Sequence, residues 1–251
     1  MLQINYTTNI GNKKFKNNQD SMLVDKQIFN DTSFKDIKSV SIQKQKTIFA
    51  VADGISASKY SQVVSGLNLE YLRESFSQDN FTIKKTIFDI QNKLENLSFQ
   101  KRYLTGASTT LAGVVIDDNK ATIFNVGDSR VYLLRDKTLS SLTNDHTQKY
   151  NMLKKNEISK DEFDNLSDIY NMLENYLVCG EFDDLFVETK TITLEKNDLL
   201  FICTDGVGDS IDDIQINSYL ADEDYKGLFK IVKKTKLDNF SFIAIKFINQ
   251  T

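Results

Sequence analysis

The sequence predicts an α+β layered sandwich, and three features of its apolar pattern indicate this class. Short runs rich in β-branched and aromatic residues alternate with polar turns, as in hairpins. Two longer segments carry apolar residues at helical spacing, and an apolar strand follows near the end. The 251 residues show no linker, repeat or change of composition, so we expect one domain over residues 1–251.

In the first half, the predicted elements are strand 47–52, helices 58–76 and 81–97, and strands 108–116, 121–126 and 130–134. The first of these strands, TIFAVA, ends at Asp53–Gly54. The polar turns DDNK and RDKT separate the later strands and favour a meander of hairpins.

In the second half, the pattern predicts helical structure from Asn144 to about Leu177, strands 186–194 and 199–204, a short helix 226–236 and a last strand 240–247. Ser159 and Glu162 have the spacing of a capping box, which is typical of an ordinary helix start.

Charge and hydropathy exclude several classes of function. The formal charge of −4 and the pI near 5.2 leave no basic stripe for nucleic acid. No apolar stretch approaches a membrane span, and the N-terminus lacks the apolar core of a signal peptide, so we expect no membrane contact and a cytoplasmic location. Cys179 and Cys203 are far apart, and Cys203 lies in an apolar strand, which favours buried thiols over a disulfide.

Five short aspartate motifs are the main chemical signal. They are NNQD, FAVADG, NVGDSR, FICTDG and LDN, which contain Asp20, Asp53, Asp128, Asp205 and Asp238. Taken singly, each is typical of a turn or cap residue. Gathered at one edge of a sheet, they would repel one another unless cations neutralise them. Oxygen ligands favour hard ions such as Mg²⁺ or Mn²⁺, so the sequence predicts a metal-dependent enzyme.

Asp53 and Asp205 are the strongest ligand candidates, because each ends an apolar strand and precedes a glycine. A glycine lets the backbone approach a ligand closely, so the Gly54 carbonyl could join the Asp53 carboxylate on a cation. Two ions about 4 Å apart could share a water, lower its pKa and hold it for attack on a phosphoryl group.

The motifs NNQD, ADG, GASTT, NVGDSR, LTNDHT, TDG and DN, in this order, resemble the metal-dependent protein phosphatases, the type 2C family. The matches run from about Asn17 to Phe247. The resemblance implies a four-layer α-β-β-α sandwich, two antiparallel sheets flanked by helices. It also implies hydrolysis of phosphoserine and phosphothreonine in proteins through a metal-bridging water or hydroxide, by a monomer.

The resemblance further implies two Mg²⁺ or Mn²⁺ ions and a third in addition, with ligands Asp20, Asp53, Gly54, Asp128, Asp205 and Asp238. Asp53 would bridge both ions, the Gly54 carbonyl would bind one, and Asp205 and Asp238 would complete the other. Asp20 would act on the Gly54 side through water, and Asp128 would help hold the third ion. Residues 147–180 would form a flap beside the site that contributes to substrate choice.

Two positions depart from the family pattern. Where the family places a phosphate-binding Arg, this chain has Phe15 between Lys14 and Lys16, and Lys16 is the better substitute. Ile55 replaces a His proposed elsewhere in the family as general acid, and it cannot donate a proton. No other side chain is assigned a catalytic role.

The remaining polar candidates are interpreted as structural. The lone His146 lies in LTNDHT, a segment that is mainly structural in the family, and Asp145 is interpreted as a turn or capping residue. Two alternatives to the phosphatase hypothesis remain: a pseudophosphatase that serves as a binding module, and a metal-dependent hydrolase of small phosphoesters. The five intact aspartates argue against the first, and only a substrate screen separates the second.

Overall fold

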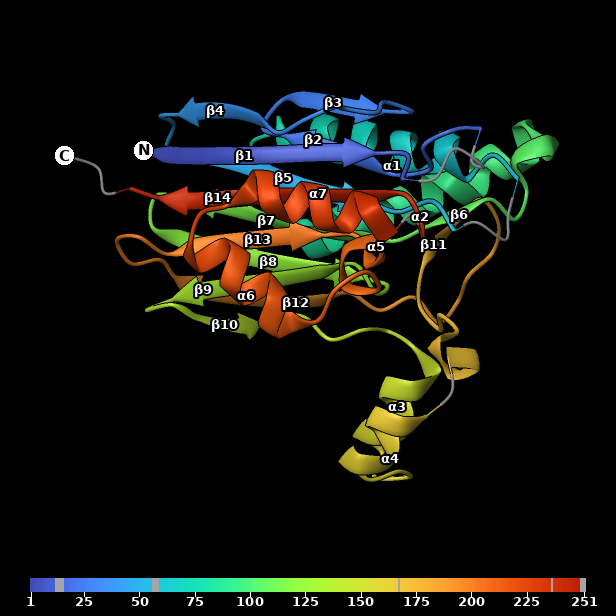
Figure 1. Cartoon of the computed structure of the whole chain (residues 1–251). Helices are drawn as coiled ribbons and strands as arrows, with labels where there is room; N and C mark the ends of the chain where they lie inside the picture. The colour runs from blue at the N-terminus through green and yellow to red at the C-terminus, as the bar shows by residue number, and fades with distance from the viewer. Residues whose placement is uncertain (12–15, 56–58, 167, 236, 249–251) are drawn as a thin grey trace.

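The computed structural model describes residues 1–11, 16–55, 59–166, 168–235 and 237–248. Two antiparallel sheets lie face to face, and helices cover the outer face of each (Figure 1). The predicted four-layer sandwich of the α+β class is therefore confirmed. The first residues and the last described residues lie at one end of the sheets, and α3 (Gln148–Lys154) and α4 (Lys160–Asn165) project from the molecule near the other (Figure 1).

The first sheet has the order β10-β9-β13-β14-β1-β4, and all of its neighbours are antiparallel. Its strands are β1 (Leu2–Asn9), β4 (Lys38–Ile42), β9 (Arg130–Arg135), β10 (Thr138–Ser141), β13 (Leu199–Cys203) and β14 (Phe240–Phe247). β1 and β14 are neighbours inside this sheet, so the first and last strands along the chain hold each other in place.

The second sheet has the order β12-β8-β7-β5-β2-β3 and is also antiparallel throughout. Its strands are β2 (Ser21–Val24), β3 (Gln27–Asn30), β5 (Lys46–Ala52), β7 (Leu111–Asp117), β8 (Lys120–Val126) and β12 (Glu188–Thr193). A separate pair joins β6 (Ser108–Thr109) to β11 (Leu177–Val178). The predicted hairpin of β7 and β8 is confirmed.

The helices are α1 (Ser61–Phe76), α2 (Ile83–Gln100), α3 (Gln148–Lys154), α4 (Lys160–Asn165), α5 (Asp205–Gly208), α6 (Asp213–Ala221) and α7 (Tyr225–Thr235), with 3₁₀ turns η1 (Arg102–Leu104) and η2 (Asp168–Asn171). Three apolar cores separate the four layers. In β5, Ile48 and Ala50 face α1 and α2 whereas Phe49 and Val51 face the other sheet, as the two-residue period of a strand requires.

The predicted helical segment from Asn144 to Leu177 is only partly correct. It contains α3, α4 and η2, separated by turns, and it ends in β11. No residue of α3 is fully buried, so little packing stabilises longer helices there. The capping box at Ser159 and Glu162 is confirmed at the start of α4.

Strands β1 to β4 and helix α6 have no counterpart in the sequence prediction. Polar residues hid β1, because Asn5, Thr7 and Thr8 are buried in it alongside the apolar ones. Both thiols are buried and free, as expected.

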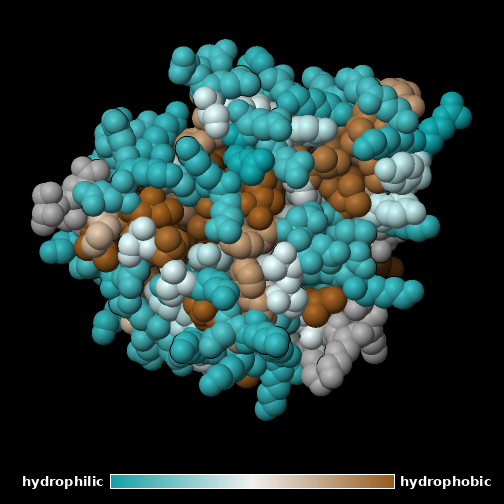
Figure 2. Space-filling view, turned by 90° about the horizontal axis from the view of Figure 1, so that it is seen from above, coloured by the Kyte–Doolittle hydropathy of each residue, from teal (hydrophilic) through white to brown (hydrophobic). Residues whose placement is uncertain are grey.

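The surface seen from above is mainly polar, with apolar side chains showing between the polar ones (Figure 2). Among the described residues, no helix is both long and apolar enough to span a bilayer.

Candidate metal centre

The five predicted aspartates lie where strands meet loops, at the end of the sandwich away from the chain termini (Figure 1). Asp20 precedes β2, Asp53 follows β5, Asp128 lies in the turn from β8 to β9, Asp205 follows β13, and Asp238 lies just before β14. The antiparallel registers pair Ser21 with Ala52 and Arg130 with Cys203, so these strand ends come to the same edge.

Four of the five carboxylates share one small cavity. The cavity has a volume of about 90 Å³ and is lined by Asp53, Ile55, Thr110, Asp128, Leu173, Asp205 and Asp238. Asp20 does not line it, but its carboxylate interacts electrostatically with those of Asp205 and Asp238. The structure therefore brings together all five acids that the motifs single out.

Asp20 is held from one side only. Its Oδ2 accepts hydrogen bonds from Thr204 Oγ1 at 2.9 Å and Ser241 Oγ at 2.7 Å, whereas its Oδ1 is buried without a partner. Burial raises the pKa of this carboxyl to about 7, and repulsion from Asp205 and Asp238 adds to the rise against the two hydrogen bonds. Without a cation, Asp20 is poorly suited to carry its charge.

Three of the other acids show the same effect on their pKa values. Burial, followed by repulsion from Asp205, raises the pKa values of Asp53 and Asp128 well above the ordinary range and also raises that of Asp238. The Asp53 backbone is anchored by Thr110, whose Oγ1 accepts the Asp53 N–H at 3.0 Å and whose N–H donates to the Asp53 carbonyl at 2.9 Å.

Gly54 is required by packing around the loop. A Cβ at this position would lie 2.8 Å from the Gln19 carbonyl oxygen and 2.8 Å from the Ser61 carbonyl carbon. Gly206 is tighter, because its Cβ would lie 1.9 Å from the Asn239 carbonyl oxygen. Both glycines that follow the strand-end aspartates thus allow neighbouring backbone to pack closely against the loops that carry Asp53 and Asp205.

Asp209 is an acid that the sequence interpretation missed. Burial and then repulsion from Asp205 raise its pKa to about 6, so it belongs electrostatically to the same cluster. The available signal was spacing: Asp209 lies one helical turn after Asp205, and its N–H donates to the Asp205 carbonyl at 2.8 Å.

The donor set fits hard cations. Asp20 Oδ1 and Asp205 Oδ1 are both buried without a hydrogen-bond partner, and the surrounding donors are oxygens. In the described part of the chain, no three His, Cys, Asp or Glu side chains are placed so that they could hold a cation in their present positions. The carboxylates therefore line a shared cavity, but they do not converge on one position where a single ion would be fully coordinated.

Comparison with known proteins settles the family. The sequence profile of protein phosphatase 2C matches residues 24–239, most of the chain. The chain belongs to this family.

Its similar proteins in the family include phosphatases of bacteria. The serine/threonine phosphatase stp of Listeria monocytogenes serotype 4b is 27% identical over 182 residues, covering 69% of this chain and 71% of that protein. Protein phosphatase PhpP of Streptococcus pneumoniae is 24% identical over 186 residues, covering 71% and 74%. The crystal structure of serine/threonine phosphatase Stp1 from Staphylococcus aureus superposes with a TM-score of 0.81 at 20% identity, over 99% of this chain and 96% of that one, and so has the same fold.

Of the two phosphate-binding candidates of this phosphatase 2C chain, the structure describes only Lys16. Lys16 is exposed in the loop before β2 and does not line the cavity. Lys14 and Phe15 lie outside the described residues. Ile55 does line the cavity, beside Asp53, so an aliphatic side chain occupies the position of the family's His.

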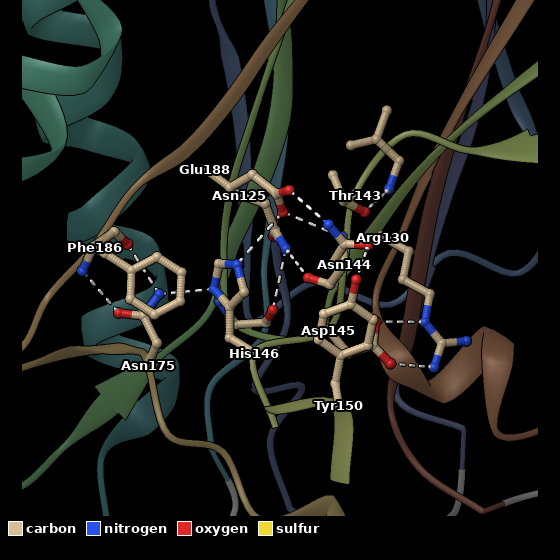
Figure 3. Close-up of polar contacts among 12 residues, drawn as sticks. Asn125, Arg130, Thr143, Asn144, Asp145, His146, Tyr150, Asn175, Phe186 and Glu188 are labelled. Carbon is tan, nitrogen blue, oxygen red and sulfur yellow. Dashed lines mark hydrogen bonds and ion pairs between the residues drawn. The ribbon is translucent and has the colours of Figure 1, made fainter. Parts of the chain in front are cut away.

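Asp145 and His146 are structural residues in this family member. The interpretation of Asp145 as a turn or capping residue is wrong, because its carboxylate receives two hydrogen bonds from Arg130, Nε to Oδ1 at 2.9 Å and Nη2 to Oδ2 at 2.7 Å. His146 is 4% exposed and contacts Gly127, Asn175 and Glu188 (Figure 3). It does not line the cavity.

Proposed function

We propose that this chain is a metal-dependent serine/threonine protein phosphatase that hydrolyses phosphoserine and phosphothreonine in proteins. The observation that carries the proposal is the pair of buried, unpartnered oxygens, Asp20 Oδ1 and Asp205 Oδ1, among further convergent carboxylates. The names of the Listeria and pneumococcal relatives support the activity. A monomeric state and a cytoplasmic location stay predictions.

The proposed cofactors are two Mg²⁺ or Mn²⁺ ions and a third in addition. The related catalytic domain of the protein phosphatase PstP is described in complex with two manganese ions, which supports this choice. Asp53, the Gly54 carbonyl, Asp205 and Asp238 would hold the two main ions, while Asp20 would act through water. Asp128 would hold the third. When bound, the ions supply Lewis-acid chemistry and lower the pKa of a water that attacks phosphorus.

The chain's own residues hold and shield this site. Thr110 fixes the backbone of Asp53 through its hydroxyl and its amide, and Thr204 and Ser241 orient Asp20. Ile55 and Leu173 supply apolar surface at the cavity, which excludes water from part of it. A phosphate monoester bound in the cavity would therefore lie next to the aliphatic side chains of Ile55 and Leu173.

A single assay tests the proposal. Phosphate release from a phosphothreonine peptide is measured with Mn²⁺ and then with excess EDTA, beside a panel of small phosphomonoesters. Mn²⁺-dependent release from the peptide supports the proposal. Release from small esters alone would favour the small-molecule hydrolase, and no release from any substrate would favour the pseudophosphatase.

Lys16→Ala is expected to raise KM for a phosphopeptide more than it lowers kcat, if Lys16 replaces the family's Arg. A contact that binds the phosphate equally in the ground state and the transition state changes KM rather than kcat. Steady-state kinetics on Lys16→Ala, Lys14→Ala and the remote, exposed Lys84→Ala measure this. A larger effect of Lys14→Ala would assign the role to Lys14, and three unchanged KM values would leave phosphate binding to the cations.

Ile55→His is expected to raise kcat for phosphothreonine peptides more than for aryl phosphates. A serine or threonine alkoxide is a poor leaving group, and a positioned general acid contributes about 10²–10⁴-fold to such steps. Substituted phenyl phosphates, compared on both forms, measure the dependence of rate on the pKa of the leaving group. A flat dependence in the wild type would mean that another group already protonates the leaving oxygen.

A further inference from the structure

His146 is the only histidine of the chain, and it is buried without lining the cavity. Figure 3 shows its imidazole between Asn175 and Phe186 on one side and Glu188 and Asn125 on the other. These neighbours come from different segments: the end of the flap, the segment that leads into β12, and β8 with the turn after it. His146 is thus a junction between them.

On one side, His146 controls the turn that carries Asp128. The Gly127 backbone N–H donates to Nδ1 of the His146 ring at 3.0 Å, and the Gly127 carbonyl accepts from the backbone N–H of His146 at 3.0 Å. Gly127 has φ +108°, and a Cβ there would lie 2.7 Å from Thr110, so the turn has one tight conformation. Asp128, the next residue, lines the cavity, and its direction follows from that turn.

On the other side, His146 holds the end of the flap. Asn175 Nδ2 lies 2.7 Å from His146 Nδ1, and the His146 carbonyl accepts from the Glu174 N–H at 2.9 Å. Leu173, the residue before Glu174, lines the cavity. His146 therefore contacts, through its side chain and its backbone, segments next to two cavity residues that lie far apart in the sequence.

Backbone donors determine the tautomer. The Phe186 N–H donates to Asn175 Oδ1 at 3.2 Å, so the Asn175 amide must turn its Nδ2 toward His146. Nδ1 then faces two donors, Gly127 N–H and Asn175 Nδ2, and must be unprotonated. The proton of the neutral ring is on Nε2, which faces Glu188 Oε2 at 3.5 Å.

The Glu188 carboxylate is suited to accept a hydrogen bond from the Nε2–H of His146. Burial opposes its ionisation, but hydrogen bonds from His146 and Asn144 lower the Glu188 pKa below its usual value. The Phe186 ring packs against the imidazole with 4.4 Å between ring centroids, which fixes the plane of the ring.

We propose that His146, as the neutral Nε2–H tautomer, is a positioning residue that clamps the Gly127–Asp128 turn to the end of the flap. Asp128 and Leu173 then keep one relative position. The clamp would affect cation binding because Asp128 is proposed to hold the third ion, and this part of the inference rests on the proposed function. The hydrogen-bond geometry of the clamp is independent of the proposed function.

The first test needs no variant. Since the chain has one histidine, ¹⁵N labelling of histidine gives one pair of imidazole nitrogen signals in the NMR spectrum. We expect an unprotonated Nδ1 and a protonated Nε2 at neutral pH. A protonated Nδ1, or signals averaged between the two tautomers, would overturn the proposal.

Two matched variants test the clamp. Asn places its Oδ1 as many bonds from Cα as Nδ1 of His, so His146→Asn retains the acceptor for Gly127 and Asn175. Gln places its Nε2 as many bonds from Cα as Nε2 of His, so His146→Gln retains only the donor to Glu188. We expect the Gly127 amide to lose protection from hydrogen exchange in His146→Gln and to keep it in His146→Asn.

We expect His146→Gln to weaken Mn²⁺ binding in calorimetry and to lower kcat by about 10–100-fold, as for residues that orient metal ligands, with a smaller loss in His146→Asn. KM for an aryl phosphate should change less than kcat, because His146 itself does not line the cavity. Equal effects of both variants on exchange and on Mn²⁺ binding would refute the clamp. If the wild type released no phosphate from any substrate, the proposed function would fail, while the tautomer and exchange results would still decide the clamp.

Discussion

Asp53→Asn is expected to lower phosphatase activity by about 10²–10³-fold, because an interaction worth several kcal/mol is lost when a ligand between two cations loses its charge. Asp53 lines the cavity and interacts with several of the other acids. Its pKa is raised first by burial and then by repulsion from Asp205 and Asp20, and Thr110 holds its backbone. Asp205→Asn and Asp238→Asn should be nearly as severe. Asp128→Asn should lower turnover while sparing the two-ion centre. Initial rates at saturating Mn²⁺ measure these effects.

The matched control is Asp117→Asn, which makes the same chemical change at an exposed residue at the end of β7. Its activity should equal that of the wild type. Residual activity of Asp53→Asn above about a tenth of the wild-type rate would contradict the two-ion assignment.

Mn²⁺ is expected to stabilise the fold strongly, because it neutralises carboxylates that repel one another in its absence. At about 100 times its dissociation constant, a ligand that binds only the folded state adds about 2.7 kcal/mol to the free energy of unfolding. For a chain of this size, that corresponds to a rise in Tm of roughly 5–11 °C. Thermal unfolding with Mn²⁺, with EDTA, and with Mn²⁺ on Asp53→Asn measures the effect. A Tm that neither Mn²⁺ nor EDTA changes would count against the whole site.

The pH dependence of the metal-free protein provides a second measurement on the same acids. Asp20 has a pKa of about 7 in the fold, above its unfolded value of about 3.9. The folded state therefore binds more protons between these values, and the free energy of unfolding should fall as pH rises from about 5 to 7. In EDTA, Asp20→Asn should make this decrease shallower, and a slope identical to that of the wild type would assign it to other groups.

The sequence predicted the central strands and the convergence of the five aspartates well, because both leave local signals. TIFAVADG and FICTDG are apolar runs that end in an aspartate and a glycine, and β5 and β13 end one and two residues before those aspartates. The segment after Asn144 was harder, since α3 has no fully buried residue and its helical pattern therefore competes with turns. β1 was missed because its buried polar residues find partners only in the fold, such as Thr8 with Asn18 and Ser241.

The sequence by itself determined the family, the sandwich class and the five acids, since ordered motifs and two-residue periodicity are local properties of the chain. Only the tertiary structure decided which residues surround those acids. Asp209 joins the cluster through a helical turn, Asp145 pairs with Arg130, and His146 links the Gly127 turn to Asn175. These relations depend on burial and on contacts between distant segments, and neither is defined until the two sheets have packed together.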